Sequence, residues 1–235
     1  MMCHARLGDA RGVALVAAVL LVMLLSAIGL GLALTASLEP AIAANFENGL
    51  VAGNAAEAAI TAVAHDLAEL DDWTLALTGA WTPRSLALPA GDDIQLPDTT
   101  HVSLAGLTHV ANCGHVQPCT PFESRAVTSD RPWGANNPQW RVAGLAQLDH
   151  LVPAMMGLPV QTVVWVGDDP SDTDGDPQVD GGPPPGEPGA PPRGRATLVL
   201  RAESFGMRGS HRLLISLVSR PDSGGALRVR PWIAR

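Results

Sequence analysis

The sequence predicts an α+β fold: a long, kinked N-terminal helix, apolar in its first half and amphipathic in its second, packed on a small antiparallel β-sheet with long loops. Three observations predict it. Residues 13–34 are apolar and uncharged, residues 35–70 repeat apolar side chains at helical spacing, and residues 71–235 break into short apolar runs separated by Pro, Gly and Asp. The chain's 235 residues suffice for one membrane segment and one modest domain.

Residues 13–34 are expected to cross a membrane. A helix needs roughly 20 apolar residues to span the hydrocarbon core, whereas the apolar part of a secretory signal usually has about 7 to 15. Arg6 and Arg11 precede this segment and no Lys or Arg follows before Arg84, which predicts a cytoplasmic N-terminus. We therefore expect a single-pass inner-membrane protein with a periplasmic C-terminal domain.

Two other interpretations of the apolar segment stay open at this point. A signal peptidase could cleave after the small residues of 34–37 or 41–44 and release a soluble periplasmic protein. Alternatively, the segment could be a plain membrane anchor without a role in assembly. The residues that follow have to discriminate between these possibilities.

Residues 35–70 are predicted to continue the helix with one apolar face. Glu47, Asn54 and Glu57 lie off that face, and Gly29, Gly31 and Pro40 are expected to bend or loosen the helix near the middle. The apolar face consists of Ile42, Phe46, Gly49, Gly53, Ala56, Ile60, Val63, Leu67 and Leu70.

The β-sheet is predicted from short runs rich in Val and Leu. The clearest strands are 160–166, 197–203 and 212–220, with 227–233 as a fourth; weaker candidates are 101–107 and 140–145. We expect them to form an antiparallel sheet packed on the amphipathic half of the helix.

The segment 168–195 begins with many acidic residues and continues with many prolines and glycines, so we expect a long, disordered, exposed loop. Its carboxylates at Asp172, Asp174, Asp176 and Asp180 have a density of hard oxygen ligands that suits calcium. The spacing departs from that of an EF-hand, because Pro177 and Gly182 occupy the positions that require Gly and Glu. A solvated acidic turn that maintains solubility is the alternative. No other cofactor is expected.

Cysteine usage points to one short cross-link. Cys113 and Cys119 are six residues apart, and in an oxidising compartment a disulfide between them would contribute about 2 kcal/mol. Free thiols are the alternative, and half of a zinc site is a further one for which no second ligand pair follows at metal spacing.

A family resemblance rests on three pieces in the first 60 residues: Arg11-Gly12-Val13-Ala14-Leu15, then Leu38-Glu39 with Ala44-Asn45, then Ala55-Ala56-Glu57-Ala58. Together they resemble the N-terminal region of PilX-type minor pilins, proteins of type IV pilus assembly. The resemblance implies a prepilin leader at residues 1–12, cleaved after Gly12 by a prepilin peptidase to leave a methylated Val13. It also implies partners: other pilins or pseudopilins that pack against the N-terminal helix in the membrane and then in the filament.

One position departs from the pattern of major pilins. They carry a Glu at the fifth mature residue, where this chain has Ala17. The absence resembles that in the K-type pseudopilin of type II secretion, which implies a subunit that initiates or caps a filament. The alternatives are a pseudopilin of a secretion system and a membrane-tethered periplasmic protein for adhesion or ligand binding.

Composition and motifs argue against two other classes of function. The net charge is −8 and the chain contains no Lys, so no basic face for nucleic acid is expected. The common signatures of hydrolases, metalloproteases and nucleotide-binding proteins are absent from the sequence, and we therefore do not expect an enzyme.

Overall fold

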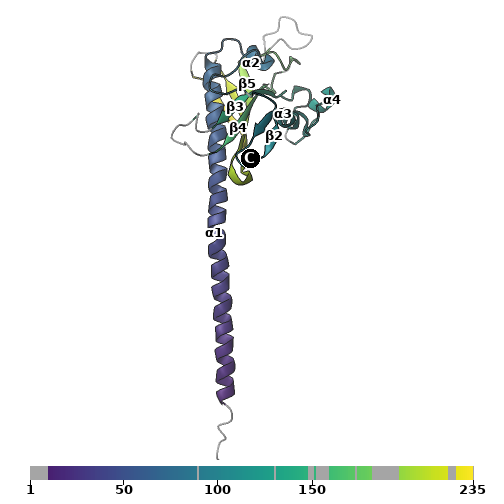
Figure 1. Ribbon diagram of the computed structural model, residues 1–235. Coiled ribbons are helices and arrows are strands. Elements are labelled where there is room, and N and C mark those ends of the chain that lie inside the picture. The colour runs from purple at the N-terminus through teal and green to yellow at the C-terminus, as the bar shows by residue number, and fades with distance from the viewer. Residues whose placement is uncertain are drawn as a thin grey trace, which may run out of the picture. The chain divides into compact units, whose positions relative to one another are not determined.

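The computed structural model describes residues 10–88, 90–129, 131–147, 151, 159–172, 174–181, 196–221 and 226–234 (Figure 1). The chain divides into two compact units, 1–46 and 47–235. The helix α1 (Ala10–Ala68) contributes to both units. It is rich in Ala and Leu, which favour helix, and it continues through Gly29, Gly31 and Pro40, so the residues expected to bend it do not interrupt it.

The second unit is built on a five-stranded antiparallel sheet in the order β3-β4-β5-β6-β7. Each strand therefore pairs with its neighbours in sequence. The strands are β3 (Arg141–Gln147), β4 (Gln161–Asp168), β5 (Thr197–Phe205), β6 (His211–Ser219) and β7 (Arg228–Ala234). A separate two-stranded sheet pairs β1 (Asp93–Gln95) with β2 (His101–Ser103). The remaining elements are α2 (Thr74–Thr78), α3 (Leu104–Cys113), α4 (Pro121–Ser124) and the 3₁₀ turns η1 (Gly134–Asn136) and η3 (Met207–Gly209).

The five-stranded sheet is covered on both faces. Val164 and Leu200 point to one face and pack against the part of α1 that follows Glu47, next to Ile60 and Val63. Figure 1 shows this part of α1 beside the strands. Successive side chains of a strand point to opposite faces, so Trp165 lies in a second core, formed by β1, α3 and the opposite face of the sheet. Burial on both faces explains why these strands read as nearly continuous apolar runs.

The α+β class, the three clearest strands and the fourth candidate are confirmed, with bounds shifted by at most two residues. The weak candidate at 140–145 is β3. The strand predicted at 101–107 is wrong beyond residue 103, where α3 begins. Ser103 is the N-cap of α3 and its Oγ accepts a hydrogen bond from the Gly106 N–H, a contact that favours helix over strand.

The predicted apolar face of α1 is buried in its C-terminal part, at Ala56, Ile60, Val63 and Leu67. Its first two members are not, since Ile42 and Phe46 are each 67% exposed. Four more alanines of α1 join the buried face: Ala52, Ala55, Ala59 and Ala64. The buried face therefore begins near residue 49. The second compact unit begins at Glu47 and so includes the last part of α1, whereas the sequence predicted a domain that begins at residue 71.

The C-terminal end of α1 is held by groups distant in sequence. Arg220, which directly follows β6, donates hydrogen bonds from Nη2 to the carbonyl oxygens of Leu67 and Leu70, at 3.3 and 2.6 Å. The Trp73 indole N–H donates to the same Leu67 oxygen at 3.0 Å, and the Arg220 guanidinium lies 5.1 Å from the centre of the Trp73 ring. Leu67 lies in the last turn of α1 and Leu70 lies two residues beyond its end. These contacts therefore join the end of α1 to the residue that follows β6.

Replacing Arg220 with Ala is expected to lower the free energy of unfolding by about 1 to 3 kcal/mol, because two carbonyl groups lose a charged donor. Arg84→Ala is the matched control: Arg84 pairs with Glu69 near the same helix end, but its side chain is 83% exposed, so its loss is expected to cost less than about 1 kcal/mol. Urea unfolding of the full chain in detergent measures both. Equal losses for the two variants would contradict this role of Arg220.

Candidate functional site

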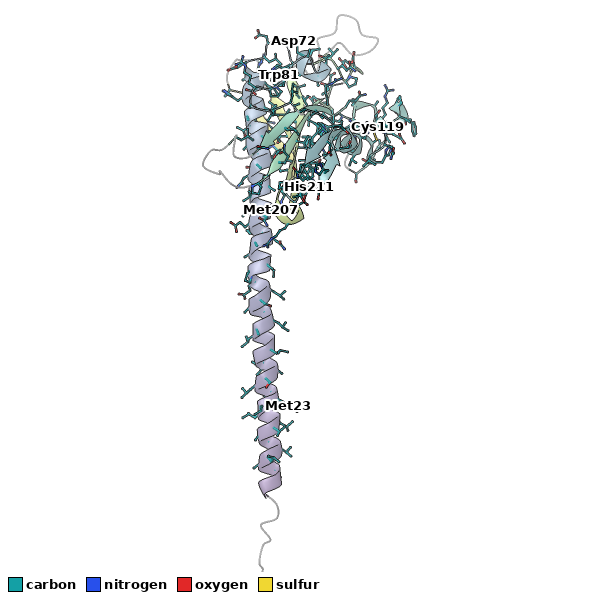
Figure 2. The ribbon with its side chains drawn as sticks, viewed as in Figure 1. Met23, Asp72, Trp81, Cys119, Met207 and His211 are labelled. Atoms are coloured by element: carbon teal, nitrogen blue, oxygen red, sulfur yellow. A yellow bond between two sulfur atoms is a disulfide. The ribbon has the colours of Figure 1, made fainter. Side chains whose placement is uncertain are left out.

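The first part of α1 presents an uncovered apolar surface. Among the described residues, α1 is the one helix that is long and apolar enough to cross a membrane, and the qualifying part of it is not buried within the chain. Large side chains project around its circumference, including Met23, which is 63% exposed (Figure 2). The exposed large side chains of this segment are Val13, Leu15, Val16, Val19, Leu20, Leu21, Val22, Met23, Leu24, Leu25, Ile28, Leu30, Leu32 and Leu34. An apolar surface of this extent requires a lipid or protein partner.

The proposed processing residues lie at the beginning of this surface. Gly12 and Val13 are the third and fourth residues of α1, and both are exposed. The first turn of a helix frays readily, because its N–H groups lack partners in the helix. Ala17 lies on the same exposed segment. It stands where the resemblance to major pilins would place a Glu, and its side chain is small and apolar.

A disulfide joins the two short helices on the far side of the sheet from α1. Cys113 ends α3 and Cys119 directly precedes Thr120, the N-cap of α4, and their sulfur atoms are bonded at 2.03 Å. Gly114 closes α3 in the left-handed conformation that glycine adopts without steric cost. A capping box between Thr120 and Glu123 begins α4. The structure thus contains the disulfide, and not the free thiols or the zinc site.

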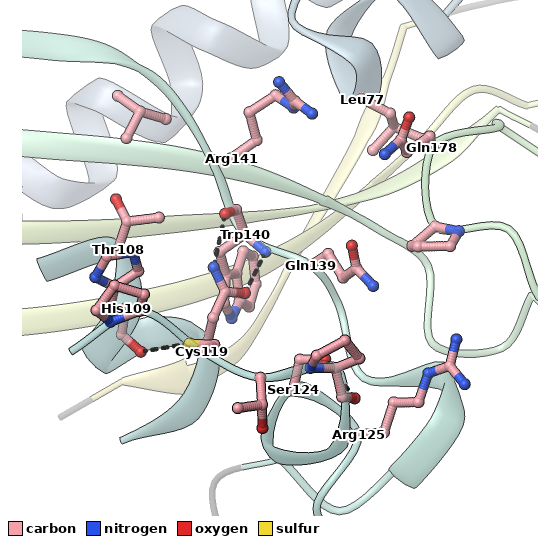
Figure 3. A pocket seen from close by; sticks show the side chains of 16 residues that line it. Leu77, Thr108, His109, Cys119, Ser124, Arg125, Gln139, Trp140, Arg141 and Gln178 are labelled. Carbon is pink, nitrogen blue, oxygen red and sulfur yellow. Dashed lines mark hydrogen bonds between the residues drawn. The ribbon is translucent and has the colours of Figure 1, made fainter. Parts of the chain in front are cut away.

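A cleft of about 550 Å³ lies beside this disulfide (Figure 3). Thr108 and His109 of α3, Arg125 after α4 and Trp140 before β3 line it, together with Gln178. Asn112 also lines the cleft, and its side chain donates to the Trp140 carbonyl oxygen at 2.9 Å and accepts from the Trp140 N–H at 2.8 Å. These two bonds fix α3 against the start of β3.

A second cleft, of about 690 Å³, contains a buried ion pair. Arg201 Nη2 lies 2.6 Å from Glu203 Oε1, and both side chains are about nine-tenths buried. Burial alone raises the pKa of the Glu203 carboxyl, but the hydrogen bond from His211 and the charge of Arg201 outweigh it, so the pKa lies below its usual value. The Arg201 guanidinium also lies 5.6 Å from the centre of the Trp165 ring. These contacts explain how a charged pair is accommodated on this face of the sheet.

The acidic segment that follows β4 forms a series of tight turns. Asp172 Oδ1 accepts from the Asp174 N–H, Asp174 Oδ1 accepts from the Asp176 N–H, and Asp176 Oδ1 accepts from the Gln178 N–H, at 2.9, 2.7 and 3.0 Å. Aspartate commonly bonds the backbone two residues ahead in this way. The alternating spacing of these acids therefore has a structural explanation that requires no metal.

The four predicted calcium ligands are not brought together as a set. Asp172 and Asp174 approach Asp168 instead, and one ligand atom from each of these three side chains lies within 4.8 Å of the others. Asp180 has another role: both of its oxygens accept from the Ala196 N–H, at 2.8 and 3.0 Å. Asp176 remains exposed and lies at the edge of the small cavity beside the three acids. Residues 182–195 of the predicted loop lie outside the described residues.

Burial of this acidic cluster was not expected from the sequence. Asp168, Asp169 and Asp172 are 7%, 8% and 4% exposed, which contradicts a fully solvated turn. Burial, the larger cause, and the charge of Asp172 together raise the pKa of Asp168 to about 8. It also raises the pKa of Asp172, against the backbone N–H groups of Asp174 and Gly181, which lower it. The sequence signal that could have indicated this burial is Asp168, which ends an apolar strand directly before the acidic turn.

No protein-family model, curated protein or solved structure matches this chain.

Removing the disulfide is expected to destabilise the second unit. The loop between Cys113 and Cys119 is short, so Cys113→Ser with Cys119→Ser should cost about 2 kcal/mol, measured as a lower melting temperature of the full chain. Reductant should destabilise the wild-type protein equally and leave the double variant unchanged. Cys3→Ser is the control and should behave like wild type. A wild-type melting temperature that persists after mass spectrometry shows the bond to be reduced would contradict the expectation.

Proposed function

We propose that this chain is a minor pilin of a type IV pilus that initiates or caps filament assembly through packing of its N-terminal helix. One observation carries the proposal: the segment from Val13 to Leu34 is a helix whose apolar side chains are uncovered all around, directly after an Arg-Gly-Val junction. In the proposal, this surface contacts lipid in the inner membrane before assembly and neighbouring helices in the filament afterwards. The sheet unit then lies in the periplasm.

Several features of the helix support packing between helices in place of simple anchoring. Small residues along the exposed segment permit the close approach on which association in lipid depends; these are Ala14, Ala17, Ala18, Gly29 and Gly31. A plain anchor would not require the helix to continue into the sheet unit, yet α1 extends to Ala68 and supplies part of that unit's core. Continuity of this kind connects the membrane segment directly to the sheet unit.

Ala17 supports a position outside the bulk of the filament. A carboxylate in the middle of a membrane helix costs about 2.5 to 3.5 kcal/mol on insertion scales, so it is retained where it has a partner. In the proposal, this chain has no neighbour above it whose N-terminal amine would need such a partner. A subunit at the tip or in the initiation complex meets this description.

A pseudopilin of a type II secretion system shares the same helix and the same processing, and is the second candidate. The uncovered helix and Ala17 favour both candidates equally. The cleft beside the disulfide (Figure 3) would favour a tethered ligand-binding protein only if a ligand were found for it.

The processed N-terminus tests the proposal. When the chain is expressed with a prepilin peptidase, mass spectrometry of the purified protein should find Val13 as the first residue, carrying a methyl group. Gly12→Leu should abolish the cleavage, because a bulky side chain then precedes the scissile bond, and Gly8→Leu in the leader is the control that should still be cleaved. A first residue at Ser37 or Asn45, or an intact Met1, would contradict the pilin class.

A further inference from the structure

Three carboxylates converge where β4 passes into the acidic segment. Asp168 is the last residue of β4, and Asp172 and Asp174 follow in the turns described above. One oxygen from each lies within 4.8 Å of the other two. Like charges at this separation repel strongly in a site shielded from water, so either protons or a cation must balance them.

A second observation, independent of this clustering, concerns Asp172. Its side chain is 4% exposed, and its Oδ2 is shielded from solvent and has no hydrogen-bond partner among the described residues. Its Oδ1 accepts from the Asp174 N–H, so the unpartnered oxygen is the one available to a ligand. A buried acceptor without a partner costs about 1 to 3 kcal/mol, and more when it is charged. The structure therefore contains a buried carboxylate oxygen that has no hydrogen-bond partner among the described residues and can accept a ligand.

The space beside these oxygens has the size of a single ion. A cavity of about 20 Å³ is lined by Asp168, Asp169, Asp172, Asp174 and Asp176, together with residues 135–138, Gly175 and Pro177. None of the described lining residues is an Arg or a His, so no side-chain cation from this part of the chain neutralises the acids.

We propose that Asp168, Asp172 and Asp174 bind one calcium ion, with Asp172 Oδ2 as a direct ligand. Calcium accepts six to eight oxygens at about 2.3 to 2.6 Å, so two of its ligands can lie up to about 5 Å apart, which accommodates the separations in this cluster. Magnesium demands a smaller and nearly ideal octahedron and retains its waters, and an irregular turn with three carboxylates suits it less well. Waters complete the coordination.

Bound calcium would fix the path of the chain between two central strands. Asp180, further along the same segment, already receives the Ala196 N–H directly before β5, and its own N–H donates to Thr74 Oγ1. The ion would hold the beginning of this segment as Asp180 holds its end. Calcium is available in millimolar amounts outside the cytoplasm, where sites of about 10⁻⁴ to 10⁻³ M affinity are occupied. The inference does not depend on assembly into a pilus; it rests on the proposed function only for the location of the sheet unit outside the cytoplasm.

Calcium itself is the probe that tests the site, on the full chain in detergent after treatment with a chelator. Isothermal titration with calcium chloride should show one ion per chain. At 10 mM calcium the melting temperature should rise by about 3 to 11 °C, and equal magnesium should give a smaller rise. Asp172→Asn, which keeps the acceptor for the Asp174 N–H, should abolish both the binding and the shift.

Asp71→Asn is the matched control, since it removes the same charge from an exposed position outside the cluster, and it should bind calcium as wild type does. Asp174→Asn is a second variant in case Asp172→Asn fails to fold, and it should weaken binding at least tenfold. The inference is overturned if wild type binds no calcium, if magnesium stabilises it equally, or if the variant that folds retains wild-type affinity.

Discussion

The contact between α1 and the five-stranded sheet is the constraint on which the rest of the second unit depends. The side chains that α1 buries from Ala52 to Ala64 are mostly alanines, with Ile60 and Val63 between them, so the helix can lie close to the strands. Arg220 and Trp73 then hold the end of the helix at the Leu67 carbonyl in its last turn. Because this face of the sheet is occupied by α1, the disulfide-bonded helices and both large clefts lie toward the other face.

The same helix has two surfaces with different requirements. From about residue 49 onward its apolar face is covered by its own chain, whereas from Val13 to Leu34 its large side chains are exposed among the described residues. A helix buried only in its second part gives the proposed minor pilin two kinds of contact, one within its own unit and one with lipid or other helices. The acidic turn, with its proposed calcium ion, belongs to the second unit and concerns the stability of that unit.

Periodicity predicted much of the fold, because strands covered on both faces are continuous apolar runs and a covered helix repeats every three or four residues. It failed where contacts between distant residues decide. Residues 101–107 resemble a strand, but Ser103 Oγ and the Ala105 N–H both donate to the Asp92 carboxylate, which fixes the start of α3. The acidic turn was misjudged for a similar reason: Asp172 and Asp174 were predicted as ligands from their spacing, whereas Asp168 joins them only because β4 ends beside them.

In the proposed function, the exposed helix assembles with pilin helices and the chain becomes a minor component of the filament. Quantitative mass spectrometry of filaments sheared from cells that express this chain together with its own pilins tests it most directly. If the chain is a minor pilin, it should be present in the filaments at a small fraction of the abundance of the bulk subunit. Two results would contradict a minor pilin: the chain is absent from filaments while it accumulates in the inner membrane, or it is as abundant in filaments as the bulk subunit.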